Sequence, residues 1–390
     1  MLPFIDLSSQ FKRIQSEVEQ RVITVLRSGQ YILGPEVSEI EDKLAEFAKV
    51  KHAISCSSGT DALIIALMAK GVGPGDAIFT TPFTYFATAE VIALLGATPI
   101  FVDIDITTFN IDPIALKSAI LALKKCDTSN KSLPKLPLEE LRSLSPKGII
   151  TVDLFGLPAD HDQINPIAAE HDLFVLEDAA QGFGGEVNGR CAGTLAEMGC
   201  TSFFPAKPLG CYGDGGALFT NNDDLASLFR SIRIHGRGVD KYENVRLGIT
   251  GRLDALQAAV LIPKLSIFPD ELKSRQRVAL TYERLISTSN LEIITPKVPD
   301  GYFSAWAQYS ILASDQTERR RFLDKLKAAG VPTMIYYMRP LHLQKALSYL
   351  GYKVGDFPVS EEASERIFSL PMHPYLDDSV IAGIVDSMAH

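Results

Sequence analysis

Short apolar runs alternate with longer helix-like stretches along residues 52–178. The runs are almost continuously hydrophobic, as expected of strands buried on both faces, and lie at 53–56, 77–81, 99–104, 148–155 and 173–178. The stretches between them have the length and pattern of helices and cover 61–70, 88–95, 112–125 and 159–171. Strands separated by helices are typical of βαβ units. The pattern therefore predicts an α/β fold with a mostly parallel sheet.

After Arg252 the pattern becomes that of a smaller α+β module. Two helical stretches, 253–265 and 269–287, lead into it, and Pro263 is expected to break the helix between them. The module has strand patterns at 308–313 and 333–337 and helix patterns at 316–329, 360–368 and 378–388. We therefore predict a large domain over residues 1–262 and a small C-terminal domain over residues 263–390.

The polar segment 125–147 interrupts the alternation of strands and helices. It contains three prolines, which are typical of surface segments, and a helix-like pattern at 138–144. We interpret it as a surface excursion that takes no part in the chemistry.

Composition narrows the functional classes. Lys and Arg number 38 against 47 for Asp and Glu, a net charge of −9, which argues against a nucleic-acid-binding protein. The chain has no signal-like start and no run of about 18 apolar residues, so we expect a cytoplasmic protein that does not enter a membrane. Its five cysteines are far apart and form no CxxC pair, so neither disulfides nor a metal site is expected.

The sequence Ser-Ser-Gly-Thr at 57–60 lies between a predicted strand and a predicted helix. The free backbone N–H groups of a helix N-terminus, together with the small Gly59 and the Thr60 hydroxyl, form a suitable site for a phosphate. The alternative is that Ser58 or Thr60 only caps the helix. The motif alone leaves both interpretations open.

Asp178 ends a strand that is expected to be buried. Open α/β sheets bind their ligands at the carboxyl ends of strands, and a buried carboxylate there needs a partner. The partner is either a protonated pyridine nitrogen, or a structural arginine or helix terminus.

Lys207 lies in an apolar turn that is bracketed by prolines and followed by glycine. Lysines are usually solvated, but such surroundings suit an amine that forms a Schiff base. A phosphate site, a strand-end carboxylate and a turn lysine, in this order, are the parts needed to hold pyridoxal phosphate (PLP).

The chain resembles the DegT/DnrJ/EryC1/StrS sugar aminotransferases, which are PLP-dependent enzymes of fold type I. The similar motifs extend over nearly the whole chain and read PFIDL, YILGPEV, EDAAQ, SFFPAKPLGCYGDGGA, GRLDALQAA, PTMIYYMRPLH and LPMHP. The motif around Lys207 resembles those of members that aminate a UDP-linked 3-keto-2-acetamido-glucuronate.

This resemblance implies a role for each matching residue. Lys207 would form the Schiff base and act as general base, and Asp178 would pair with the pyridinium nitrogen. Gln181 would lie near the ring hydroxyl, and Tyr85 and Ala180 on the two ring faces, although Tyr85 has the alternative of being a core aromatic. The residues implied to bind the phosphate are Gly59, Thr60 and Ser202.

Two positions depart from the family pattern. Thr250 stands where relatives usually carry an Asn that reaches the cofactor phosphate of the neighbouring subunit, and a hydroxyl offers a shorter reach and one donor. Tyr336 and Tyr337 stand where relatives with 3-keto-uronate substrates commonly carry His-Tyr, which removes a possible cation beside an acidic sugar.

We expect an aminotransferase that moves the amino group of L-glutamate to a nucleotide-linked keto sugar, a UDP-linked 3-keto-2-acetamido hexuronate, for surface polysaccharide synthesis. The alternative within the family is a 4-keto-6-deoxy sugar 4-aminotransferase. A sugar dehydratase would have His at Lys207, and a nicotinamide-dependent oxidoreductase would need a glycine fingerprint that is missing.

The substrate phosphates require local cations, because the net charge of the chain is negative. The candidates, each of which has the alternative of a solvated surface charge, are Arg233, His235, Arg237, Arg252 and Arg339. The resemblance further implies a homodimer in which the segment containing Thr250 and Arg252 completes the site of the neighbouring subunit.

Overall fold

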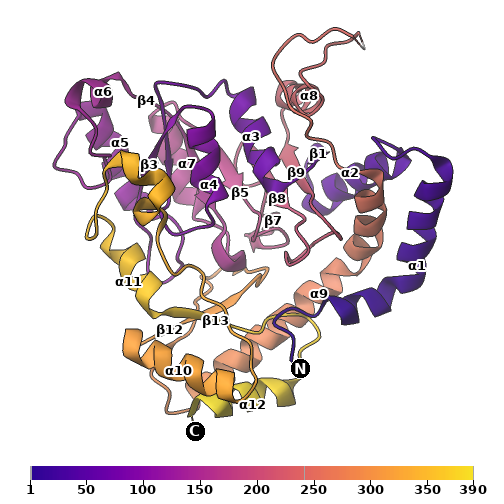
Figure 1. Cartoon of the computed structure of the whole chain (residues 1–390), viewed down its shortest axis with the longest axis vertical. Coiled ribbons are helices and arrows are strands. Elements are labelled where there is room, and N and C mark those ends of the chain that lie inside the picture. Colours follow the sequence, from indigo (N-terminus) through magenta and orange to yellow (C-terminus); the bar gives the residue numbers. More distant parts are fainter. Residues whose placement is uncertain (1, 241, 390) are drawn as a thin grey trace.

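The computed structural model describes residues 2–240 and 242–389, and its larger part is built around a seven-stranded sheet (Figure 1). In spatial order the strands are β1 (His52–Cys56), β9 (Gly216–Thr220), β8 (Met198–Ser202), β5 (Phe174–Asp178), β4 (Ser145–Val152), β2 (Asp76–Thr80) and β3 (Thr98–Phe101). β9 runs antiparallel to both of its neighbours, and the other pairs are parallel. The predicted α/β fold with a mostly parallel sheet is therefore confirmed.

Helices cover both faces of this sheet, which explains the continuous hydrophobicity of its strands. Ile150 of β4 packs in the cluster of α3 (Gly59–Ala69), α4 (Ala87–Leu94) and α8 (Asp223–Ile232). The adjacent Ile149 packs on the other face, in the cluster of α5 (Pro113–Lys125) and α7 (His161–Glu170). The polar excursion carries α6 (Leu138–Ser143), close to the predicted short helix.

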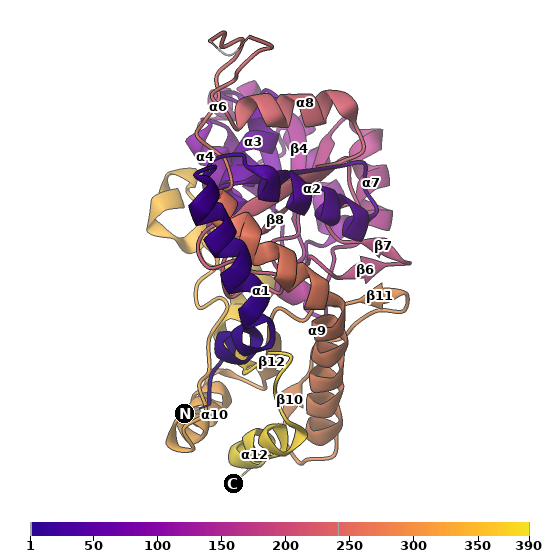
Figure 2. The same cartoon turned by 90° about the vertical axis from the view of Figure 1, so that its right-hand side faces the viewer.

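A single long helix, α9 (Ala255–Ser287), connects the larger part to the smaller one (Figure 2). The prediction that Pro263 breaks it is wrong, since the helix continues through Pro263 and Pro269. Buried side chains lie on both sides of Pro263, and the helix packs against α1 (Leu7–Ser28) and α2 (Pro35–Ala48), so tertiary packing outweighs the lost backbone hydrogen bond. The predicted domain boundary falls inside α9 and stays a prediction.

The C-terminal part contains a three-stranded antiparallel sheet with helices around it. Its strands are β10 (Ile293–Ile294), β12 (Tyr309–Ala313) and β13 (Ile367–Leu370), and its helices are α10 (Gln316–Ala328), α11 (Pro358–Arg366) and α12 (Asp378–Ala389). A third sheet of two-residue strands joins β11 (Tyr302–Phe303), β6 (Glu186–Val187) and β7 (Arg190–Cys191).

Two predictions for this part are wrong. Residues 333–337 form no strand and make only an isolated bridge, from Met334 to Ser369. The helix predicted at 360–368 ends at Arg366, because the next four residues form β13 and are fully buried. A short apolar run of this length fits a helix end and a strand equally well. Across residues 2–240 and 242–389, no helix combines the length and the apolar character needed to span a bilayer.

Candidate active site

A cavity of about 420 Å³ lies where strands β1, β5 and β8 end. Its walls contain most of the residues predicted from the sequence: Gly59, Thr60, Tyr85, Asp178, Ala180, Gln181, Ser202, Lys207, Tyr336 and Tyr337. These residues come from segments up to 278 positions apart, so the fold rather than the chain order brings them together. The volume is in the range of small-molecule sites.

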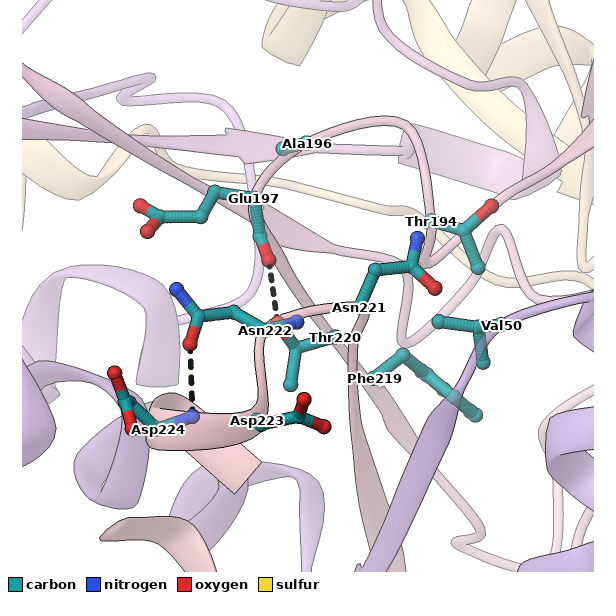
Figure 3. Close-up of a pocket in the computed structure, with 10 residues that line it drawn as sticks. All are labelled: Val50, Thr194, Ala196, Glu197, Phe219, Thr220, Asn221, Asn222, Asp223 and Asp224. Atoms are coloured by element: carbon teal, nitrogen blue, oxygen red, sulfur yellow. Dashed lines mark hydrogen bonds between the residues drawn. The ribbon is translucent and has the colours of Figure 1, made fainter. Parts of the chain in front are cut away.

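A second hollow, of about 540 Å³, lies at the start of α8 and contains none of the predicted residues (Figure 3). Two of its three acidic side chains already have partners, since Glu197 pairs with Lys70 and Asp223 with Lys51. Asn222 caps α8 by accepting from the Asp224 backbone N–H. These contacts are those of a solvated surface, and we assign no chemistry to this hollow.

The phosphate end of the cavity is formed by the start of α3. Ser58 is the residue that caps the helix, as its hydroxyl accepts from the Asp61 backbone N–H at 3.0 Å. Within the described residues, the backbone N–H groups of Gly59 and Thr60 make no hydrogen bond and are free for a ligand. A Cβ on Gly59 would lie 2.7 Å from the Ser202 Cβ, so only glycine allows the start of α3 to approach the end of β8 this closely.

Asp178 ends β5 with its side chain buried, at 6% exposure. Its carboxylate accepts from the Thr88 hydroxyl and from the Ala180 backbone N–H, both at 3.1 Å. Burial raises the pKa of Asp178, while these donors and the Lys207 ammonium act in the opposite direction. In the described part of the chain no arginine pairs with it, so the structural-arginine alternative has no support.

Lys207 is held in a tight turn after β8. Its backbone N–H donates to the Phe204 carbonyl at 2.9 Å, and a Cβ on Gly210 would lie 2.6 Å from the same oxygen. Burial lowers the pKa of Lys207, and the Asp178 carboxylate partly offsets this effect. The amine is thus desolvated and directed into the cavity, as a nucleophilic lysine requires.

Gln181 connects two walls of the cavity. Its Oε1 accepts from the Phe155 backbone N–H at 2.8 Å, and its Nε2 donates to the Tyr337 hydroxyl at 3.1 Å. Burial raises the pKa of Tyr337, so this phenol stays protonated. Tyr85 is 60% exposed, which excludes the alternative that it is a core aromatic.

Thr250 and Arg252 do not line this cavity. The Thr250 hydroxyl forms a hydrogen bond with Nε2 of His235 at 2.7 Å. Arg252 lines a neighbouring hollow of about 420 Å³, which shares Ser58 and Asp214 with the cavity. The Arg252 Nε is buried there without a hydrogen-bond partner among the described residues.

The other candidate cations lie outside the cavity too. Arg233 is buried and pairs with Glu41, and it also donates to the Ser55 carbonyl, so its charge is used inside the protein. Arg339 is exposed and absent from the cavity walls.

Sequence reasoning missed several residues of the cavity. Thr88 donates to Asp178 without lining the cavity itself, and it lies in a helix whose other residues are apolar except Glu90, so a polar position there was a usable signal. Ile5 and Asp214 line the cavity as well and belong to the PFIDL and SFFPAKPLGCYGDGGA motifs, from which no role was predicted for them. Gln308 also lines the cavity, but no local pattern marks it, because only the folded chain brings its segment to the strand ends.

A comparison with protein families identifies one match. Residues 12–389 match the DegT/DnrJ/EryC1/StrS aminotransferase family. A relative, the UDP-2-acetamido-2-deoxy-3-oxo-D-glucuronate aminotransferase of Pseudomonas aeruginosa, is 47% identical over 98% of both chains.

Solved structures share the whole fold. A DegT DnrJ EryC1 StrS aminotransferase from Brucella abortus has a TM-score of 0.91 and 45% identity, and the match covers 100% of both chains. DesV of S. venezuelae has a TM-score of 0.88 and 30% identity, over 100% of this chain and 97% of the other.

Proposed function

Because the chain belongs to the DegT/DnrJ/EryC1/StrS aminotransferase family, we propose that it transfers the amino group of L-glutamate to a UDP-linked 3-keto-2-acetamido hexuronate. The enzyme is a PLP-dependent sugar aminotransferase. The proposed active site rests on one observation: a single cavity is lined by Lys207, Asp178, Gln181 and Gly59. The sugar is supported by the relative that is 47% identical and is named for such a substrate.

The cavity fits PLP at each of its polar ends. The free N–H groups of Gly59 and Thr60, with the Ser202 hydroxyl beside them, suit the phosphate. The buried Asp178 carboxylate suits a protonated ring nitrogen, whose positive charge would favour the ionised acid. The Gln181 amide suits the ring hydroxyl.

PLP, when bound, supplies an electron sink and carries the amino group between the two substrates. Lys207 would supply the amine that holds the cofactor and would then carry a proton between Cα of the amino donor and the cofactor carbon. Its lowered pKa favours the neutral, basic form that both tasks need. Asp178 keeps the ring nitrogen protonated, and Tyr337 orients Gln181 through their hydrogen bond.

The nucleotide-sugar phosphates need cations that the cavity of one chain lacks, since Lys207 is its only Lys or Arg among the described residues. We assign this role to Arg252 of the neighbouring subunit of a homodimer, and we assign to Thr250 of that subunit a contact with the cofactor phosphate. The unpaired Nε of Arg252 and the connected hollow support this assignment. The product would enter surface polysaccharide, including lipopolysaccharide, and its synthesis would take place in the cytoplasm.

A panel of nucleotide-linked keto sugars tests the proposed substrate. The enzyme is first converted to its amino form with glutamate and then mixed with UDP-3-keto-2-acetamido-glucuronate, UDP-3-keto-2-acetamido-glucose or dTDP-4-keto-6-deoxyglucose. Return of the visible cofactor absorbance with the first sugar alone supports the proposal. Reaction with the 4-keto sugar alone would instead support the 4-aminotransferase alternative.

A further inference from the structure

Two carboxyl groups are buried together directly behind Asp178. Asp153 follows β4 and Glu177 precedes Asp178 on β5, and both side chains are fully inaccessible. With His161 of α7, they place one ligand-type atom each within 4.8 Å of one another. The mechanism proposed above uses none of these three side chains.

The two carboxyl groups have different hydrogen-bond partners. Both oxygens of Glu177 accept from backbone N–H groups, of Gly193 and Leu195, at 2.7 Å. Asp153 accepts through Oδ1 from the Ala159 N–H at 3.0 Å. Its Oδ2 is buried without a donor in the described chain, and one carboxylate oxygen of Asp153 lies within 4.8 Å of one of Glu177. Two acceptors form a hydrogen bond only when one of them carries a proton.

The surroundings favour a proton on Asp153. Burial and the Glu177 charge raise the pKa of Asp153 well above its ordinary value, and Asp178 adds a further negative charge. Burial lowers the pKa of His161, so the imidazole brings no compensating charge. The titratable groups facing Asp153 are Glu177 and Asp178 of β5, His161 of α7, Cys191 of β7, Cys200 of β8 and Tyr302 of β11.

Asp153 begins the turn that orients Gln181. The Phe155 N–H, two residues later, donates to Gln181. On its other side Asp153 packs so closely on Gly182 that a Cβ there would lie 2.5 Å from Oδ2. The Asp153 backbone N–H also donates to the Asp178 carbonyl, at 3.1 Å. Asp153 therefore connects the strand of Asp178 to the turn that holds Gln181.

We propose that Asp153 and Glu177 share one proton, with Asp153 as the donor, and that this hydrogen bond positions Gln181 in the cavity. Asp153 is thus a positioning residue that touches neither substrate nor cofactor. The shared proton is inferred from the buried Asp153–Glu177 pair alone. The positioning of Gln181 rests in addition on the function proposed for Gln181. A shared proton also removes one negative charge from beside Asp178, which must stay ionised to serve the ring nitrogen.

The test compares two isosteric amide substitutions. Asp153→Asn keeps a donor toward Glu177, so kcat of the glutamate half-reaction should stay within about twofold of wild type. Glu177→Gln places an NH₂ group against a backbone N–H, so kcat should fall about tenfold as Gln181 loses its alignment. The infrared spectrum of the wild-type holoenzyme at neutral pH should contain a protonated-carboxyl band that is absent from the spectrum of Asp153→Asn. The exposed control Asp270→Asn should retain this band.

Three results would overturn the proposal. The first is the absence of that band from the wild type, or its persistence in Asp153→Asn. The second is an equal loss of kcat in both amide variants, which would mean that Asp153 acts as an ionised group. The third is one chelatable divalent ion per chain in the purified protein, lost in both variants, which would make the cluster a metal site. The glutamate half-reaction needs no sugar, so a wrong sugar assignment leaves all three readouts intact.

Discussion

The cavity and the segment from His235 to Arg252 hold their predicted site residues in different ways. In the cavity, Asp178 and Gln181 are buried and hydrogen-bonded within the chain. In the segment, Thr250 and His235 are exposed, and the described parts of the loop between α8 and α9 project from the body of the molecule (Figure 1, Figure 2). These cavity side chains find their partners within one chain. The segment has exposed polar groups and apolar side chains, among them the 87% exposed Leu247.

This difference separates two kinds of functional residue. The cavity residues have partners that fix their orientation before any ligand binds, as precise chemistry requires. The Arg252 guanidinium has a buried Nε without a partner, so its surroundings are incomplete in a single described chain. We therefore expect substitutions in the cavity to act on chemistry and those in the segment to act across subunits.

The largest effect is expected for Lys207→Ala. The variant should fold but lose turnover by about a thousandfold or more, since no other lysine lines the cavity among the described residues. Single-turnover measurements of both half-reactions, with circular dichroism as the folding control, check this. Normal transamination by the variant would refute the assignment of Lys207.

Asp178→Asn should lower kcat by about a hundredfold, because a neutral amide cannot keep the ring nitrogen protonated. Phosphate anchoring at Gly59 should survive, so the cofactor should still bind. Cofactor titration and the half-reaction rate measure the two effects separately. An unchanged kcat with an unchanged cofactor spectrum would mean that Asp178 is only structural.

The contrast between the two regions also explains what the sequence could predict. Asp178 ends one strand and Gly59 follows another, and the hydrophobicity of the sequence marks both strands; the ends of parallel strands meet at one edge of a sheet. Gln308 carries no such mark, because its place at the cavity comes from contacts between distant segments. Pro263 was misjudged because a local rule about helices was outweighed by packing against α1 and α2.

Mixed dimers test whether the segment that contains Arg252 completes the cavity of the neighbouring subunit. Lys207→Ala and Arg252→Ala chains, each nearly inactive alone, are coexpressed with different affinity tags, and the hybrid dimer is isolated. One of its two sites is free of both changes if the sites are shared, so about half of the wild-type activity should return. A hybrid that is confirmed by mass and stays inactive would place both residues in the same chain's site.

Gly59→Ala should weaken cofactor binding about tenfold, because the new Cβ would press on the Ser202 Cβ at 2.7 Å and open the phosphate end. The matched control is Gly383→Ala, at an exposed helix position with nothing within 4 Å of the new Cβ. That change should leave the cofactor affinity unaltered. Equal affinities in both variants would show that the close approach at Gly59 is not part of the phosphate site.

The smallest effect is expected at Thr250, where the hydroxyl is the only donor of the side chain. Thr250→Val preserves the shape and removes the hydrogen bond, so the cofactor dissociation constant should rise about threefold if this hydroxyl contacts the phosphate across the dimer. Thr250→Asn should restore or exceed the wild-type affinity, since the longer amide has more donors. His235→Ala, which removes the 2.7 Å partner of Thr250, distinguishes the alternative. If the hydroxyl only pairs with His235, Thr250→Val and His235→Ala should leave cofactor affinity unchanged and lower thermal stability to the same small extent.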